Sequence, residues 1–103
     1  MKIQWTVLAV EKLEEYGDYI ALDNPTAALK WTDSIRNSIN RLKRFPQSGR
    51  EVRELKRLEI RELIEGSYRI IYHVEKSHVT ILTIRHSKQL LRMKDLHKKN
   101  RGK

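Results

Sequence analysis

Three runs of β-branched and aromatic residues occupy the second half of the chain, at 60–64, 68–74 and 79–86. Gly66 separates the first run from the second, and the polar segment 75–78 separates the second from the third. Runs of this kind, bounded by turn residues, are typical of short strands. The pattern therefore predicts three consecutive antiparallel strands.

A two-residue loop at Lys76 and Ser77 would set the register of the last two of these strands. The predicted pairs are Val74 with Val79, Tyr72 with Ile81, Arg69 with Ile84 and Ser67 with His86. Because directly opposed residues share a face, one face is almost wholly apolar and is predicted to be the core side. The other face places Arg69 diagonal to His86 and is either a binding face or a cationic rim. A slip of one residue would move His86 to the opposite face.

The first half of the chain has the periodicity of two amphipathic helices. Thr6 can cap the first helix, which follows a short strand at 2–5, and its apolar stripe is Ala9, Leu13, Tyr16 and Ile20. Asn24 and Pro25 suit the cap and first turn of a second helix, predicted to end at Phe45, before Pro46. Its stripe is Ala28, Trp31, Ile35, Ile39 and Leu42. The short turn between the helices predicts an antiparallel helical hairpin.

These elements give the order β-α-α-β-β-β and predict an α+β fold, with the helical hairpin packed on one face of a small, mainly antiparallel sheet. The first strand is expected to join the sheet by pairing with a later one. The loop after Phe45 gives Gly49 freedom to take a positive φ. Segment 50–58 is charged and poorly patterned and is expected to be an irregular, mobile connection. A short basic helix is expected around 90–96.

The length and charge of the chain limit its possible functions. The 103 residues suit one domain, predicted at 1–96, with a basic tail at 97–103. The formal net charge is +9, and +7 of it lies in residues 85–103, which favours an anionic partner such as a nucleic acid, a ribosome or an acidic protein. The chain has no cysteine and no apolar run of membrane-spanning length, so the cytoplasm is the expected location and no membrane partner is expected.

No common catalytic motif occurs, the four histidines lack metal-ligand spacing, and neither a metal nor a cofactor is expected. What remains is basic and aromatic. Cleavage of RNA needs a general acid or base and a cation that stabilises the phosphorane, and His86 with Arg69 could supply both. Both residues lie off the predicted core face, so their removal is expected to leave the fold intact. Alternatively, Tyr68 and Tyr72 simply fill the core, and Arg61 pairs with a neighbouring glutamate.

Several short motifs, in order, span about residues 3–91. They are Trp5-Thr6, Tyr19-Ile20-Ala21 before Asp23-Asn24-Pro25, Phe45-Pro46 with Gly49-Arg50, Ile60-Arg61-Glu62-Leu63, Tyr68-Arg69-Ile70-Ile71-Tyr72, and Ile81-Leu82 leading to Arg85-His86. In order and spacing they resemble the RelE/ParE superfamily of toxins from type II toxin–antitoxin systems, some of which stabilise plasmids. The resemblance implies a cytoplasmic, growth-inhibiting toxin with a cognate acidic antitoxin.

The superfamily divides by target. ParE-like members poison DNA gyrase, whereas RelE-like members are ribosome-dependent endonucleases, or mRNA interferases. The Asp23-Asn24-Pro25 turn, the ending Ile84-Arg85-His86-Ser87-Lys88 and the lack of any tyrosine after Tyr72 favour a gyrase poison. The alternative is a RelE-like nuclease acting on mRNA at the ribosome, and a second alternative is a non-catalytic, basic nucleic-acid-binding module. The resemblance implies catalytic roles for Arg69 and His86 in a nuclease, and nucleic-acid or target contacts for Arg61, Arg85, Lys88 and Arg92.

Overall fold

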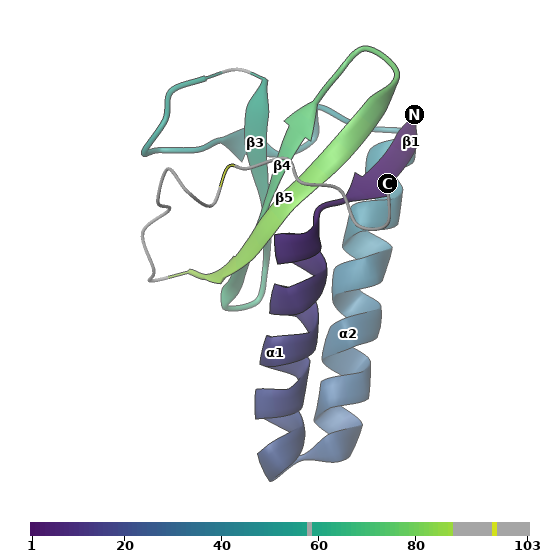
Figure 1. The fold of residues 1–103 in the computed structure, drawn as a ribbon, viewed down its shortest axis with the longest axis vertical. Helices are drawn as coiled ribbons and strands as arrows, with labels where there is room; N and C mark the ends of the chain where they lie inside the picture. Colours follow the sequence, from purple (N-terminus) through teal and green to yellow (C-terminus); the bar gives the residue numbers. More distant parts are fainter. Residues whose placement is uncertain (58, 88–95, 97–103) are drawn as a thin grey trace.

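A computed structural model describes residues 1–57, 59–87 and 96. The helical hairpin consists of α1 (Val7–Asp23) and α2 (Pro25–Asn40), followed by the 3₁₀ turn η1 (Arg41–Lys43). The strands are β1 (Lys2–Trp5), β2 (Arg50–Glu51), β3 (Ile60–Glu65), β4 (Tyr68–Val74) and β5 (His78–His86). The hairpin packs on one face of the sheet (Figure 1). The predicted α+β architecture is confirmed.

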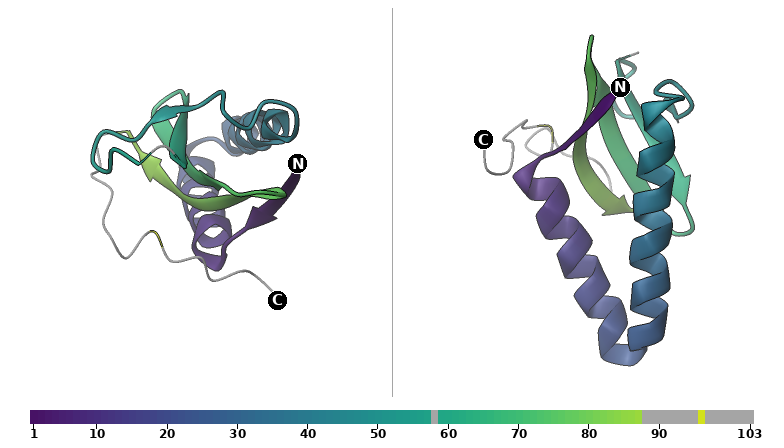
Figure 2. Two further views of the ribbon diagram at one scale, coloured as in Figure 1. Left: turned by 90° about the horizontal axis from the view of Figure 1, so that it is seen from above. Right: turned by 90° about the vertical axis from the view of Figure 1, so that its right-hand side faces the viewer.

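The five strands form one sheet in the order β1-β5-β4-β3-β2. β1 pairs with β5 in parallel, as expected for a first strand that joins a later one, and the other neighbours are antiparallel. Figure 2 shows the twisted sheet and the hairpin from two further directions. The face that the helices cover is the proximal face, and the opposite one is the distal face.

The main core lies between the helices and the proximal face. From the helices it includes Ala9, Leu13, Ile35, Ile39 and Leu42, and from the sheet Ile70, Tyr72, Val79, Ile81 and Ile84. Apart from Ile20, which lies beyond the core, both predicted helical stripes are buried or pack against it, and Tyr72 fills it. A smaller cluster, Val52, Ile60, Ile71 and Leu82, lies on the distal face, where Leu55 and Leu96 pack against it.

Both predicted helix caps are present. The Thr6 hydroxyl accepts a hydrogen bond from the Ala9 amide at 3.0 Å, and the Asn24 carboxamide accepts one from the Ala27 amide at 3.0 Å. Pro25 occupies the first turn of α2. The prediction that this helix reaches Phe45 is wrong, because α2 ends at Asn40 and the chain tightens into η1.

The segment after the hairpin is more regular than expected. Arg50 and Glu51 pair with Glu62 and Arg61 of β3, and Val52 is completely buried. The sequence did not predict this short strand, because the segment was expected only to connect the hairpin to the sheet. A strand of two charged residues has no hydrophobic alternation that a sequence could reveal. The predicted helix at 90–96 and the tail at 97–103 lie outside the described residues, except for Leu96.

The predicted register of β4 and β5 is confirmed only at the hairpin end. Val74 faces Val79 and Tyr72 faces Ile81, but an irregularity then shifts the ladder by one residue. Ile71 faces Thr83, and Leu82 is the extra residue of a β-bulge. Beyond the bulge, Arg69 faces Arg85, not Ile84, and His86 faces Tyr68, not Ser67. The predicted diagonal of Arg69 and His86 on one face is therefore wrong.

Thr6 ties the first helix to this bulge. Its backbone N–H donates to the Ile81 carbonyl at 3.1 Å. Its hydroxyl proton is shared between the carbonyls of Ile81 and Leu82, at 2.9 and 2.8 Å. Thr6 is 1% exposed, so these groups have no alternative partner in bulk water. The helix start and the bulge thus stabilise each other.

No helix in the described part of the chain is both long and apolar enough to span a membrane.

Replacing Thr6 with valine should destabilise the fold by about 2–3 kcal/mol, because it removes a cap worth ~1 kcal/mol and leaves buried amide and carbonyl groups unsatisfied. Asn24→Ala is the matched control, since it removes an exposed cap of the same kind and should cost about 1 kcal/mol. Urea unfolding followed by circular dichroism measures both. Equal losses in the two variants would show that the bulge does not depend on Thr6.

Candidate functional site

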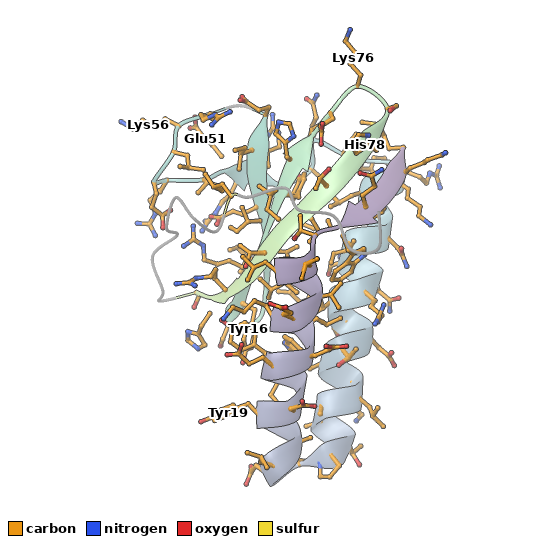
Figure 3. The ribbon with its side chains drawn as sticks, viewed as in Figure 1. Tyr16, Tyr19, Glu51, Lys56, Lys76 and His78 are labelled. Atoms are coloured by element: carbon orange, nitrogen blue, oxygen red, sulfur yellow. The ribbon has the colours of Figure 1, made fainter. Side chains whose placement is uncertain are left out.

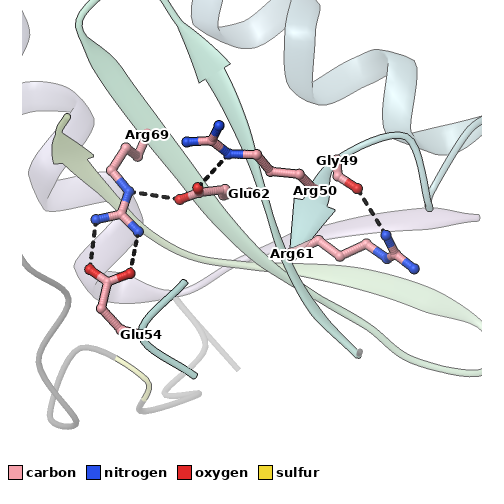
Figure 4. A network of polar contacts seen from close by, with 6 residues as sticks. All are labelled: Gly49, Arg50, Glu54, Arg61, Glu62 and Arg69. Carbon is pink, nitrogen blue, oxygen red and sulfur yellow. Dashed lines mark hydrogen bonds and ion pairs between the residues drawn. The ribbon is translucent and has the colours of Figure 1, made fainter. Parts of the chain in front are cut away.

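The centre of the distal face is a carboxylate held between two guanidinium groups (Figure 4). Glu62 of β3 is 2% exposed. Its Oε1 accepts a hydrogen bond from Nε of Arg69 on β4 at 2.7 Å, and its Oε2 accepts one from Nε of Arg50 on β2 at 2.8 Å. One buried side chain therefore joins three neighbouring strands.

Arg69 is bound from its other side by Glu54, in the segment that follows β2. The Nη1 and Nη2 atoms of Arg69 donate to the two carboxylate oxygens of Glu54 at 3.0 and 2.9 Å. All three guanidinium nitrogens of Arg69 thus donate to carboxylates, in the planar geometry that an arginine fork favours. The side chain of Arg69 is 8% exposed and that of Glu54 is 22% exposed, so the guanidinium is buried and the ion pair is partly buried.

These contacts set the charge state of Arg69. The hydrogen bonds that Arg69 donates to Glu54, and then to Glu62, raise the pKa of Arg69, although burial of the guanidinium opposes the shift. Arg69 is therefore a permanent cation. Removing either carboxylate would leave part of that charge buried without compensation.

Arg85 lies beside this network, because the bulge in β5 places it directly opposite Arg69. It is buried, with 7% of its surface exposed. The distal face thus gathers Arg50, Arg69 and Arg85 with two glutamates. A phosphate that approached Arg69 in this arrangement would meet both carboxylates.

His86 lies on the proximal face, half-buried. Its ring meets the ring of Tyr68 edge-on, with centroids 5.4 Å apart. The ring of Tyr68 in turn packs against the rings of Tyr16 in α1 and Trp31 in α2, with centroids 5.0 Å apart in each pair. The expectation that His86 shares a face with Arg69 is wrong, and His86 belongs to an aromatic cluster between the sheet and the hairpin.

Arg61 is a structural contact at the edge of the sheet. Its Nη1 donates to the carbonyl of Gly49 at 2.9 Å, rather than to a neighbouring glutamate, which was the structural alternative to a target contact. The amide of Gly49 donates to the hydroxyl of Tyr72 at 2.8 Å. Burial raises the pKa of Tyr72, which the Gly49 hydrogen bond partly opposes. Tyr72 therefore stays neutral at physiological pH.

Gly49 is required by close approach, not by a positive φ as expected. A Cβ at this position would overlap the Tyr72 hydroxyl and lie 2.6 Å from the Glu62 carbonyl oxygen. Gly66, in the turn between β3 and β4, has a φ of 60°. The other two predicted contact residues, Lys88 and Arg92, lie outside the described residues.

The sequence reasoning missed Glu54 and Glu62 as site residues. Glu62 carries a signal that could have been used, because it shares a strand face with Ile60, two positions earlier, and a carboxylate on a buried face needs a cationic partner. Glu54 carries no such signal, since it lies in a segment without periodicity.

Comparisons with known proteins match this fold to bacterial toxins. One relative, a protein of Sinorhizobium fredii (strain NBRC 101917 / NGR234) named "Putative toxin Y4kP", is 35% identical over 88 residues, which cover 85% of this chain and 90% of that protein. A solved structure, the chromosomal ParDE TA system from P. aeruginosa, has a chain with a TM-score of 0.71 and 25% identity, covering 85% of this chain and 97% of that one.

A second solved structure, the toxin–antitoxin complex RelBE2 from Mycobacterium tuberculosis, has a TM-score of 0.52 at 20% identity, covers 82% of this chain and 88% of that one, and supports the fold. Fold and relatives thus define a toxin of the RelE/ParE superfamily. Residues 3–91 match the model of the ParE toxin of the type II toxin–antitoxin system parDE, and the chain belongs to that family.

The variant Glu62→Leu should destabilise the fold by about 3–5 kcal/mol, because it leaves Arg69 buried without one of its carboxylates. Arg50→Leu is the matched control. It removes the other partner of Glu62 and leaves one buried carboxylate oxygen unsatisfied, but the ion pair with Arg69 remains, so the loss should be smaller, about 1–2 kcal/mol. Chemical denaturation measures both values. A loss for Glu62→Leu no larger than that for Arg50→Leu would contradict a structural role for the buried pair.

Proposed function

We propose that this chain arrests bacterial growth by poisoning DNA gyrase and that a cognate acidic antitoxin holds it inactive. The main observation in favour of gyrase is that the guanidinium group of Arg69 is already bound within the protein. The cation that a nuclease would aim at the scissile phosphate is engaged by Glu54 and Glu62. Membership of the ParE family supports the same target.

RNA cleavage asks for more than a basic surface. A general acid or base and a phosphorane-stabilising cation must reach one phosphate together. Here His86 and Arg69 occupy opposite faces of the sheet, because the bulge in β5 turns His86 toward Tyr68. Inhibition by protein–protein contact needs no such pair.

The proposed antitoxin follows from charge. Residues 85–103 carry +7 of the net +9. An acidic segment, disordered when free, could wrap this part of the toxin and be ordered by it. The similar solved structures from P. aeruginosa and M. tuberculosis are a ParDE system and a toxin–antitoxin complex.

The second candidate is a ribosome-dependent mRNA endonuclease, and the pairing of Arg69 with Arg85 on the distal face favours it. If Glu54 moved away, these two guanidinium groups could bind one phosphate. In this alternative Arg69 stabilises the phosphorane, and Arg61, Lys88 and Arg92 hold the RNA backbone. His86 transfers a proton only if the end of β5 rearranges and brings it to the distal face.

Two assays run on the same purified protein separate the candidates. A supercoiling assay with gyrase should show inhibition and accumulation of cleaved DNA, whereas primer extension on translating ribosomes should show no new mRNA ends. His86→Ala should inhibit gyrase within about twofold of the wild type, since it removes an aromatic contact and no reacting group.

Codon-periodic mRNA cuts, abolished by His86→Ala, together with unaffected gyrase would establish the nuclease instead. Salt-sensitive binding to DNA or RNA without growth arrest would indicate a nucleic-acid-binding module.

A further inference from the structure

The helical hairpin is longer than the sheet that it covers. The ends of α1 and α2 that meet at Asn24 extend beyond the strands in Figure 1 and in the side view of Figure 2. Burial falls along α1 accordingly. Ala9 and Leu13 are 0% and 5% exposed, whereas Tyr19 and Leu22 are 72% and 87% exposed. The far half of the hairpin therefore presents large apolar side chains that the sheet does not cover.

Around the turn these side chains line an open hollow of about 670 Å³. Its walls, which we call the overhang surface, are Tyr19, Ile20, Leu22, Asp23, Asn24 and Ala27. Figure 3 shows Tyr19 projecting away from the helices. Contiguous exposed apolar side chains on a small protein commonly mark an interaction site.

The overhang surface is held in shape by its own turn. The Asn24 amide donates to the Ile20 carbonyl at 2.9 Å and so closes α1. The Asn24 side chain accepts the Ala27 amide at 3.0 Å and so opens α2. A surface on two capped helices is already ordered, so it loses little conformational entropy when a partner binds.

The charge around the overhang surface is opposite to that of the chain as a whole. Residues 11–23 contain five acidic side chains, all exposed, and one lysine, and the start of α2 adds the exposed Lys30, within a protein of net charge +9. Asp18 and Asp23 lie nearest the turn in sequence. Complementarity therefore favours a partner with lysine or arginine side chains around an apolar group, and it disfavours the acidic antitoxin.

We infer that the overhang surface is where this toxin contacts its protein target. The inference rests on the proposed function, so the target is gyrase. A gyrase segment with an apolar side chain fills the hollow, and its basic side chains face Asp18 and Asp23. The antitoxin and the target thus bind surfaces of opposite charge on one toxin.

The test is the variant Leu22→Lys, which puts a cation on the apolar wall without disturbing the core, because Leu22 is 87% exposed. Phe45→Lys is the matched control, since it makes the same kind of change at an exposed side chain outside the hairpin turn. Purified gyrase is the probe. Leu22→Lys should raise the toxin concentration needed for half-inhibition of supercoiling by at least about tenfold, and Phe45→Lys should leave it within about twofold.

Tyr19→Ser provides a second variant that removes an apolar wall without adding charge, and circular dichroism checks the fold of each protein. Wild-type potency in both Leu22→Lys and Tyr19→Ser would overturn the inference while leaving the proposed function standing. Equal losses in Leu22→Lys and Phe45→Lys would also overturn it, because the effect would not be local.

If the wild type leaves gyrase unaffected, the proposed function fails. Growth arrest after induced expression then tests whether the overhang surface binds a different protein target. Arrest that Leu22→Lys relieves and Phe45→Lys does not would support the overhang surface. Arrest in all three proteins, or no arrest in the wild type, would overturn the inference. A wild-type dimer that only Leu22→Lys dissociates in sedimentation would assign this surface to a second copy of the chain and would also overturn it.

Discussion

A single buried carboxylate organises the distal half of this molecule. Glu62 joins Arg50 of β2 to Arg69 of β4, and Arg69 reaches on to Glu54 in the segment that covers the distal cluster. A carboxylate in this position is tolerable only because two guanidinium groups satisfy it, and a guanidinium at Arg69 only because two carboxylates do. The edge strand, the covering segment and the central hairpin are therefore tied to one set of charges. The same ion pairs limit what the distal face can bind, since a guanidinium group that already donates to two carboxylates binds phosphate poorly.

Most of the fold could be predicted from residue patterns because local chemistry and long-range packing agree there. Thr6, Asn24 and Pro25 are favourable caps or first-turn residues, and most of the apolar stripe of each helix faces the core. The register beyond Tyr72 could not be predicted. Ile81, Leu82 and Ile84 are all apolar and buried, so the sequence there fits either face, and a one-residue bulge leaves no trace in the pattern. That bulge depends on hydrogen bonds from Thr6, which is 75 positions away from Ile81 in the chain.

The same bulge explains why the candidate site could be predicted only in part. It places Arg85 opposite Arg69 and turns His86 toward Tyr68, so an expected pair of catalytic residues lies on two faces of the sheet. The acidic partners of Arg69 come from a short edge strand and its covering segment, which have no hydrophobic periodicity. The distribution of charge, too, could be predicted only in part. The acidic helix and the basic C-terminal residues are plain in the sequence, but only the fold shows that the acidic part surrounds an uncovered apolar surface.

We propose that Arg69 serves the fold and not a reaction. The double variant Glu62→Leu with Arg69→Leu tests it most directly, because replacing a buried ion pair with apolar side chains of similar volume is often neutral for stability. The measurement is inhibition of gyrase supercoiling by the purified double variant, after urea unfolding has confirmed a stable fold. We expect potency within about twofold of the wild type. A folded double variant that no longer inhibits gyrase or arrests growth would contradict it, since Arg69 would then act on the target itself.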